Sequence, residues 1–597
     1  MRRVGHLLRC RTRRPARLGG AALLVCVTGI ATAGDVASDM RSDVQIRAMA
    51  DEIARSKTLQ LNNLDKPYFI QYSTSDATEL SARASLGGLI SSQRIHFRSP
   101  RVEVRVGSYQ FDNTNSIFTA ATRMRGFPVD DDYDALRTGF WLSTDSFYKL
   151  ATDQITRKRN ALREISDPDK TADFATAKPV QISRSVRNIA PDQKQWDDTV
   201  RQLSGRFVNH PDVLTSAVSV RIISSTYRLV NSEGTEIRIP ENMSELQVRA
   251  TAMAPDGNRV WNHRFITALQ PSDFPSTNEL AQAADAVASE TEALAKAPLA
   301  SDYSGPVLFE QAAAAQLIAQ VMENAAWLPR KPVAPPESTP RVIENVWSSR
   351  LGSKVTPDWL SIWDDPTQQH FNGTALAGAY DVDDEGVPAE RVVLVDKGTL
   401  KGFLLSREPV RDFKTSNGHG RLPGPFGSEQ AVPGNLFVHT DKAVSEAKLK
   451  TQLLEKIKAQ GLKFGLVIRR LDFPSTASYE ELESIVRQVQ KDGYFRSLNS
   501  PLLAYRLYPD GREELVRGLR FREFSAKNLR DIIAASDRPY VLNYVNNGNS
   551  INHADAGLDA TTSSVICPSL LFEDVDLARA ENEPNKAPIV PPPALIQ

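Results

Sequence analysis

The alternation of apolar and polar residues predicts a first part built from helices and antiparallel strands. Residues 42–62 carry apolar side chains at helical spacing and charged ones on the other face, which predicts an amphipathic helix. Residues 102–113 alternate apolar and polar positions, and residues 218–229 do so more loosely, so both runs predict strands. The turn sequences NSEG (231–234) and PDG (255–257) predict that the strands around them pair in antiparallel fashion.

A helix followed by a strand–helix unit marks the middle of the chain. Residues 277–297 consist of strong helix formers and stop at Pro298. Residues 305–321, GPVLFEQAAAAQLIAQV, begin as a buried strand and continue as an alanine-rich helix, with one acid, Glu310, at the junction. We place a domain boundary between these two segments, near residue 300.

The pattern beyond residue 330 indicates a second part rich in β-structure. Residues 330–340 are rich in proline and predict a loop or arm. Residues 391–406 and 502–518 are hairpin-like, and residues 479–492 between them predict a helix. The proline-rich end, residues 581–597, is expected to be a flexible tail.

Length and composition narrow the class of protein. A chain of 597 residues predicts two large domains or three smaller ones. The 41% hydrophobic and 24% charged residues are those of an ordinary globular protein, which excludes a disordered, collagen-like or multi-span membrane chain. Lys and Arg balance Asp and Glu at 72 each. No basic stripe interleaved with aromatic residues indicates nucleic-acid binding.

The amino terminus predicts export. Residues 1–33 contain seven arginines and no acid, and the apolar run from Leu18 to Ala33 ends in Ala-Thr-Ala, which fits a signal-peptidase site. A retained membrane anchor is the alternative, but the run is shorter than the roughly 20 apolar residues that a spanning helix needs. We therefore expect a signal peptide at 1–33 and a periplasmic or extracellular protein with no membrane span after cleavage.

The cysteines predict no internal disulfide in the mature chain. Cleavage removes Cys10 and Cys26 and leaves Cys567 alone. Cys567 lies in the apolar run SSVICPSLLF, which favours a small core residue over a nucleophile.

Motifs of known chemistry are absent from the sequence. It contains no nucleophile elbow, phosphate-binding loop, C-x-x-C pair or H-E-x-x-H helix. No two of its eight histidines lie within five residues of each other, so the sequence offers no local metal pair. Residues 380–388, YDVDDEGVP, match the first half of a calcium loop but have Val392 where the last ligand belongs, so a type I turn is the better interpretation.

Several segments of the second part, taken in order, resemble the TldD/PmbA family. They are GPVLFE with its helix, NGTALAGAYDVDDEGVPAERVVLVDKGTLKGFLLS (372–406), TSNGHGRLPGPFG (415–427), PGNLFV (433–438) and VICPSLLFEDVDL (565–577). The resemblance covers about residues 300–580. In the first part, SLGGLISSQR and VEVRVGSYQFDN are similar to an exported subgroup of that family.

The resemblance implies a two-domain α+β fold and a role in peptide processing. It implies an N-terminal α/β domain at 34–300 and a β-sheet-rich C-terminal domain at 301–580. It also implies that a zinc-bearing TldD subunit pairs with a zinc-free TldE subunit to process small peptides. In TldD-like members an H-E-x-x-x-H helix and a cysteine near the carboxyl end bind the zinc, and the glutamate acts as general base.

Only the glutamate of that motif is present here. The motif falls on residues 309–314, where Phe309 and Ala314 occupy the histidine positions and Glu310 matches the base. The cysteine position falls within 546–558, so Cys567 is out of register. The simplest role for Glu310 is then a helix-start acid that interacts favourably with the helix dipole.

Two hypotheses follow. The first is an exported, metal-free, TldE-like subunit without a cofactor that binds an extended peptide and pairs with a TldD-like partner or with itself. The second is an active zinc peptidase in which His370, His419 or His553 converge on Glu310. Apart from Glu310, the candidate cleft residues are Asp384, Glu385, Ser416, Asn417 and His419. We expect His419, flanked by glycines in a loop, to be exposed to solvent.

Overall fold

The computed structural model describes residues 40–61, 63–119, 124, 126–166, 168–186, 189–340, 345–474, 498–547 and 560–580. The expected signal peptide (1–33), the helix at 479–492 and the tail therefore lie outside the described residues, as does most of the segment expected to hold the family's cysteine. No helix in these described ranges is long and apolar enough to cross a membrane.

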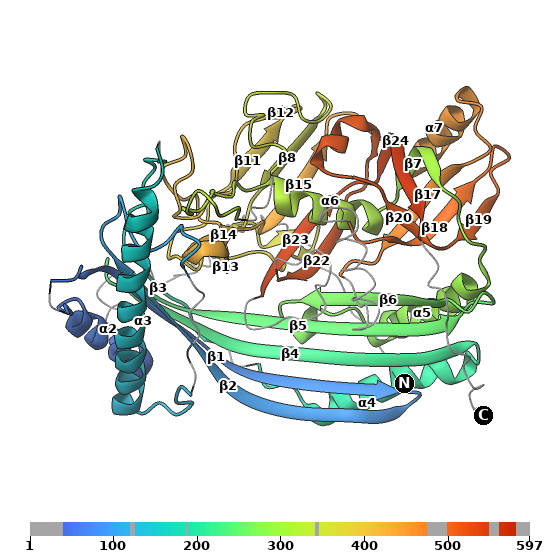
Figure 1. The fold of residues 1–597 in the computed structure, drawn as a ribbon. Helices are drawn as coiled ribbons and strands as arrows, with labels where there is room; N and C mark the ends of the chain where they lie inside the picture. Colours follow the sequence, from blue (N-terminus) through green and yellow to red (C-terminus); the bar gives the residue numbers. More distant parts are fainter. Residues whose placement is uncertain are drawn as a thin grey trace, which may run out of the picture.

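A six-stranded sheet of long strands forms the first half (Figure 1). Its main path is β2 (Gly88–Val106), β1 (Pro67–Ser85), β4 (Val213–Asn231), β5 (Glu236–Met253) and β3 (Gln181–Ser183), and β6 (Arg259–Ala268) also pairs with β5. All of these pairs are antiparallel except that of β3 with β5. The turns predicted at NSEG and PDG join β4 to β5 and β5 to β6, so both predictions are confirmed.

The strand predicted at 102–113 is correct only as far as Val106. Gly107 adopts φ +104°, a conformation that favours glycine, and the backbone then folds back, with Ser108 N donating to Phe111 O at 2.9 Å. The alternation of apolar and polar residues continues into this turn, although the ladder of hydrogen bonds does not.

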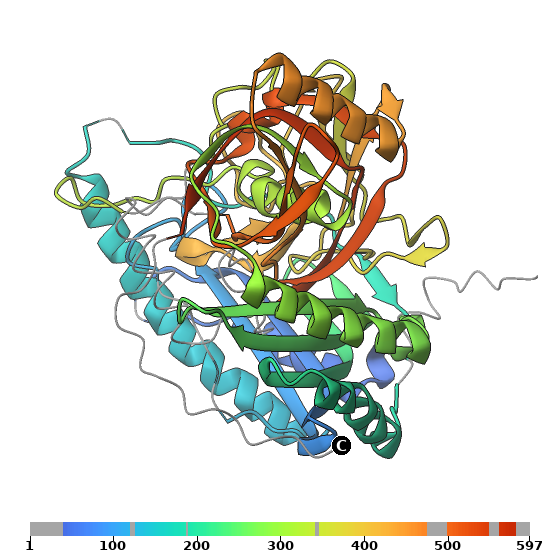
Figure 2. The same ribbon diagram turned by 90° about the vertical axis from the view of Figure 1, so that its right-hand side faces the viewer.

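Helices cover one face of this sheet (Figures 1 and 2). They are α2 (Val44–Ser56), α3 (Tyr133–Leu162), α4 (Gln193–Gly205) and α5 (Thr277–Lys296). The apolar side chains of alternate strand residues, such as Leu80, Val220 and Leu246, pack with α4 and α5 in one core. The helix predicted at 277–297 is confirmed, and the one predicted at 42–62 is correct only as far as Ser56. Helix α5 begins with a capping box formed by Ser276 and Glu279.

Two larger sheets and two small ones form the second half. The first large sheet has the order β16 (Ala443–Val444), β21 (Ile532–Ser536), β24 (Leu570–Arg579), β7 (Tyr303–Phe309), β17 (Gly465–Leu471), β18 (Pro501–Leu507) and β19 (Glu513–Val516), with β20 (Leu519–Phe521) also on β24. The second has the order β12 (Thr399–Leu400), β11 (Val392–Asp396), β8 (Leu360–Asp364), β15 (Asn435–Thr440), β23 (Thr561–Cys567) and β22 (Tyr540–Asn546). The small sheets are β9 (His370–Phe371) with β10 (Thr374–Ala375), and β13 (Gly420–Pro423) with β14 (Glu429–Ala431).

Helix α6 (Ala312–Ala325) lies in the centre of this half, and α7 (Glu446–Ala459) lies on its outside (Figure 1). Nearly every residue of α6 is buried, as expected for a helix made mostly of alanine and larger apolar residues. The strand–helix unit at 305–321 and the hairpins at 391–406 and 502–518 are confirmed. Cys567 is buried in the same core as α6, as predicted.

The second half lies over the face of the long sheet that the helices leave uncovered (Figure 2). Polar contacts fix this arrangement at one end, where the Asp472 carboxylate contacts His263 Nε2 at 2.7 Å and accepts a hydrogen bond from Trp261 Nε1 at 3.1 Å. Arg470 and Glu290 form an ion pair at 2.8 Å beside them. The predicted mixed fold of helices and sheets is confirmed.

Candidate functional site

A cleft of about 1330 Å³ lies between the long sheet and loops of the second half. Side chains of β1, β2, β4 and β5 form its floor, among them Ser75, Arg101, Tyr227 and Glu241. The acidic turn at 380–384 and the β13–β14 hairpin form its roof. The volume exceeds that of a typical small-molecule pocket, which is about 300–1,000 Å³.

The floor is polar because successive side chains of a strand point to opposite faces. On β1 and β4, Leu80 and Ile222 face the helices, whereas Ser75, Ser225 and Tyr227 face the cleft. On the same face, Tyr227, Leu229, Ile237 and Ile239 form a small apolar cluster with Val382 of the second half. The cleft beside this cluster is lined by many hydrogen-bonding groups.

Most arginines of the cleft are paired with carboxylates. Arg101 pairs with Glu429, and Arg221 pairs with Glu79 at 2.9 Å. The same holds for Arg98, Arg105 and Arg184. Arg421 is different: it donates to Thr562 O at 3.0 Å and lies over the Tyr380 ring at 4.1 Å, without a carboxylate within ion-pair distance among the described residues.

Two carboxyl groups, Asp384 in the cleft and Glu429 next to the cleft residue Ser428, have raised pKa values. Burial raises the pKa of Asp384 well above its usual range, and the negative charges of Glu241 and Glu429 add to the effect. Burial also raises the pKa of Glu429 to about 7, although its partner Arg101 opposes the shift. Ionising Asp384 together with Glu241 and Glu429 is therefore unfavourable.

The acidic turn forms as predicted, and its backbone is held in place from both halves. Gln71 Nε2 donates to Asp384 O at 3.0 Å, and Asp384 N donates to Gly420 O at 2.9 Å. The Asp383 carboxylate accepts hydrogen bonds from Gly420 N at 3.0 Å and from two amides of its own turn. Because these amides occupy its oxygens, Asp383 is a turn-forming residue and not a calcium ligand.

Asp384 lines the cleft, whereas Glu385 does not. Glu385 is buried beneath the turn, and its Oε2 accepts from Arg407 N at 2.5 Å. Burial raises its pKa well above the usual range, and the neighbouring Asp383 charge contributes. The predicted cleft role of Glu385 is therefore replaced by a structural one.

The loop of Ser416, Asn417 and His419 also lies outside the residues that line the cleft. Asn417 binds the backbone of residues 403 and 405, and Ser416 Oγ donates to Leu405 O at 3.1 Å. His419 is fully buried, so the prediction that it is exposed is wrong. Its Nε2 faces Asp364 Oδ1 at 3.1 Å, and its Nδ1 faces Asn417 O at 2.9 Å. A carboxylate 55 positions earlier in the chain makes burial of the imidazole favourable.

Glu310 lies in a chain of ion pairs at the surface. Its side chain is 25% exposed and accepts from Arg469 Nε at 2.9 Å, and Arg469 also contacts Glu513 at 2.8 Å. Neither His370 nor His419 is a partner of Glu310, and the third histidine of that hypothesis lies outside the described residues. Helix α6 begins two residues after Glu310, so the predicted position at the helix start holds. The ion pair with Arg469 is an additional contact that the sequence did not predict.

The residues at the family's zinc motif do not fit a zinc ion. Phe309 and Ala314 are fully buried, and Phe309 packs edge-on against Phe572 with ring centroids 5.3 Å apart. Neither side chain has a lone pair to donate to a metal. Over the described ranges, no group of three or more His, Cys, Asp or Glu side chains is arranged to hold a metal ion.

Helix α6 does carry buried polar side chains that the sequence reasoning missed. Gln316 donates to Phe473 O at 2.6 Å and accepts from Leu471 N at 2.8 Å. Gln320 accepts from Asn499 N at 2.8 Å. These amides bind backbone groups, so they position the strand ends around α6. Their placement among alanines on a buried helix was the available sequence signal.

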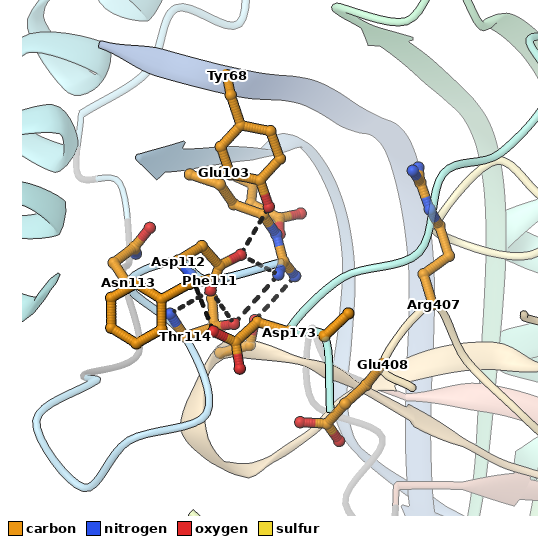
Figure 3. Close-up of polar contacts among 12 residues, drawn as sticks. Tyr68, Glu103, Phe111, Asp112, Asn113, Thr114, Asp173, Arg407 and Glu408 are labelled. Carbon is orange, nitrogen blue, oxygen red and sulfur yellow. Dashed lines mark hydrogen bonds and ion pairs between the residues drawn. The ribbon is translucent and has the colours of Figure 1, made fainter. Parts of the chain in front are cut away.

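A buried ionic network borders the cleft near α3 (Figure 3). Lys158 Nζ contacts Asp173 at 2.6 Å, and Arg105 contacts Asp112 at 3.0 Å. Arg330 of the second half reaches Asp173 at 3.3 Å. Arg105 and its neighbours Asn113 and Thr114 line the cleft. The network therefore connects the cleft wall, α3 and the second half.

Comparison with known proteins identifies the second half. Residues 303–471 match the family model of the PmbA/TldA metallopeptidase C-terminal domain. A metalloprotease of Archaeoglobus fulgidus is 40% identical over 79 residues, which are 13% of this chain and 17% of the relative. One of Methanocaldococcus jannaschii is 32% identical over 82 residues, 14% of this chain and 17% of the relative. The chain thus matches less than a fifth of the length of these curated relatives.

Solved structures extend the similarity of fold to most of the chain. TldE from Thermococcus kodakarensis superimposes with a TM-score of 0.54 at 12% identity and covers 89% of this chain and 100% of its own. A Thermotoga maritima protein described as a modulator of a DNA gyrase gives a TM-score of 0.53 at 16% identity, with 89% and 99% covered. At these identities the likeness establishes the fold of both halves and leaves the chemistry to the residues themselves.

Proposed function

Because the chain belongs to the TldD/PmbA family, we propose that it is a metal-free, TldE-like component of peptide processing that binds peptides in the cleft between its two halves. The cleft carries this proposal. It combines a polar sheet floor with charged and aromatic side chains, and its volume exceeds that of a small-molecule pocket. An extended peptide has backbone donors and acceptors along its whole length, and such a floor offers partners for them.

We propose that this subunit binds no metal because the residues at the two histidine positions of the zinc motif are apolar. Phe309 and Ala314 belong to the apolar core of the second half. Replacing them with histidines would require the core around α6 to repack. We therefore assign peptide hydrolysis to a TldD-like partner subunit. If the chain instead pairs with a second copy of itself, that dimer binds peptides without cleaving them. Export to the periplasm or cell exterior is proposed from the basic and apolar amino terminus alone.

The decisive experiment measures zinc content and peptide cleavage of the mature chain, purified without a metal-binding tag. We expect less than about 0.1 zinc per chain and no chelator-sensitive cleavage of a mixed peptide library. One zinc per chain with cleavage abolished by chelator would refute the proposal in favour of the active peptidase built around Glu310.

Peptide binding is tested with two variants, one inside the cleft and one outside it. Arg421→Ala removes a cleft cation and is expected to weaken binding of a short peptide about tenfold, as for the loss of one charged hydrogen bond. Glu310→Gln changes the surface ion pair outside the cleft and is expected to leave binding unchanged. Equal affinities of wild type and Arg421→Ala would argue against the cleft as the binding site.

A further inference from the structure

Helix α3 and the edge of the long sheet add an apolar region to one end of the cleft. We propose that this region is a subsite for one large apolar side chain, aromatic or aliphatic, of the bound peptide. The inference rests on the proposed function and deepens it, because it states which class of peptide the cleft selects. The side chains that line the region are Val102, Val104, Phe127, Phe147, Leu150 and Ala151.

The cleft reaches this region because it passes around the edge of the long sheet. β2 is the edge strand of that sheet and pairs with β1. Arg101 and its neighbour Val102 both line the cleft, although successive side chains of a strand point to opposite faces. The cleft therefore extends beyond β2 to the face that α3 covers (Figure 1).

The walls of this region keep apolar surface partly uncovered. Phe127, Phe147 and Leu150 are only half-buried, although the two phenylalanines pack against the core between α3 and the sheet. The apolar cluster around Val382 in the middle of the cleft is closed by comparison, since Val382 is only 5% exposed. Contiguous apolar surface inside a cleft is typical of a site that buries part of a ligand.

Phe127 is held in place from two sides. Its ring lies against Gly139 of α3, where an added Cβ would stand 2.8 Å from the ring. Glycine is a poor helix former, and at this position it permits the close contact. Arg98 of β2 donates to Pro128 O at 3.0 Å and to Asp130 O at 3.1 Å, which fixes the segment after Phe127 to the sheet. The aromatic wall therefore exists before a ligand binds, and a fixed wall reduces the entropy lost on binding.

The polar side chains beside this region are bonded to one another. Gln154 is buried, and its Oε1 accepts from Asn113 Nδ2 at 3.1 Å. Arg98 pairs with Asp76 at 2.9 Å and with Asp131 at 2.7 Å. A charged or amide side chain would lose its hydration here and find these neighbours already engaged. An apolar side chain instead removes its own surface and that of the walls from water, which is favourable.

Calorimetric titration of the mature protein tests the subsite with acetylated hexapeptide amides. Each peptide consists of glycine and serine with one variable residue, which is phenylalanine, leucine, lysine, glutamate or alanine. A single distinctive residue lets the peptide adopt whichever register in the cleft binds best. We expect the phenylalanine and leucine peptides to bind at least about tenfold more tightly than the alanine peptide, because one large apolar side chain becomes buried. The lysine and glutamate peptides are expected to bind no more tightly than the alanine peptide.

Two pairs of variants connect this selectivity to the region. Leu150→Asn replaces an apolar wall with a polar side chain and is expected to bring the phenylalanine and leucine peptides within about twofold of the alanine peptide. Its control is Leu142→Asn on the same helix, because Leu142 is 54% exposed and does not line the cleft. Phe147→Ala and Phe111→Ala form the second pair, since both side chains pack against the same core but only Phe147 lines the cleft. Selectivity is expected to fall in Phe147→Ala and to persist in Phe111→Ala.

The outcomes separate the two proposals. Equal binding of the phenylalanine, leucine and alanine peptides by the wild-type protein would overturn the apolar subsite and leave peptide binding intact. Failure of every peptide to bind would overturn the proposed function and the subsite together. Selectivity that persists in both Leu150→Asn and Phe147→Ala would overturn the assignment to this region. A change of oligomeric state in Leu150→Asn, measured by light scattering, with selectivity retained, would make the region a subunit contact and also overturn the subsite. Melting temperatures close to wild type show that the variants are folded.

Discussion

Replacing Lys158 by methionine should destabilise the first half strongly, because it removes the centre of the buried network. Lys158 Nζ donates to Asp173 at 2.6 Å, to Thr114 O at 2.6 Å and to Asp112 O at 3.1 Å. Burial lowers the pKa of Lys158, while the charges of Asp173 and Asp112 oppose that shift. Methionine replaces the aliphatic part of the lysine side chain and provides no donor, so three acceptors lose their partner.

The magnitude follows from what remains around Asp173. Removing one partner of a buried ion pair typically costs about 3–5 kcal/mol. Arg330 still reaches Asp173 at 3.3 Å, and Asp112 N still donates to it at 2.9 Å. We therefore expect the lower end, about 3 kcal/mol, which corresponds to a fall of about 6–12 °C in the melting temperature of a domain of 150–250 residues.

The matched control is Lys149→Met on the same helix. Lys149 pairs with Asp145 one turn away at 2.6 Å, and its side chain is 55% exposed. An exposed pair of this kind contributes at most about 0.5 kcal/mol, so a change of no more than about 2 °C is expected. Differential scanning calorimetry of the mature protein gives both values. Equal shifts for the two variants would contradict the reasoning that burial sets the cost.

A second variant tests whether the charge or the hydrogen bonds dominate. Asp173→Asn in the Lys158→Met background removes the carboxylate that the first change leaves with fewer partners. Since an unpaired buried charge costs more than an absent pair, the double variant should recover part of the lost stability. A further fall equal to that of Asp173→Asn alone would show that the two residues act independently.

Three further predictions concern single positions. Burial raises the pKa of Glu245 to about 7, so the protonated carboxyl stabilises the folded protein at low pH, and this stability is lost as pH rises from about 4.5 through 7. Glu245→Gln should therefore flatten the fall in melting temperature between pH 5 and 8, and parallel curves for variant and wild type would contradict this. Gly386→Ala and Gly352→Ala both place alanine at φ +77°, which costs about 1 kcal/mol of stability in each variant. Only at Gly386 does the new Cβ meet another residue, at 3.0 Å, so the melting temperature of Gly386→Ala should fall further. Equal shifts for the two variants would show that this contact has no effect on stability. Asp364→Ala removes the acceptor facing buried His419 and should cost about 2 kcal/mol in urea unfolding, whereas an unchanged midpoint would show that the pair is dispensable.

Local patterns along the chain were enough to predict most helices and strands and the fold class. Hydrophobic periodicity and turn residues suffice for the helix at 277–297, the strand–helix unit at 305–321 and the two predicted hairpins, because these depend on neighbours in the chain. The resemblance of the second half to the TldD/PmbA family could also be recognised from the sequence, because it depends on short segments in a fixed order along the chain. Periodicity failed at Gly107, where the apolar alternation continues and a positive φ ends the strand.

The roles of the polar residues could be read only from the folded protein. His419 was expected at the surface and is buried, because Asp364 supplies its acceptor from a distant strand. Glu241 gave no signal in the sequence, since an acid in a strand is usually a solvated side chain. Glu241 lines the cleft because the face of β5 that carries it lies opposite the turn at 380–384, more than 100 residues further along the chain. Contacts at such separations depend on how sheets and loops pack, and a local pattern carries no record of that packing.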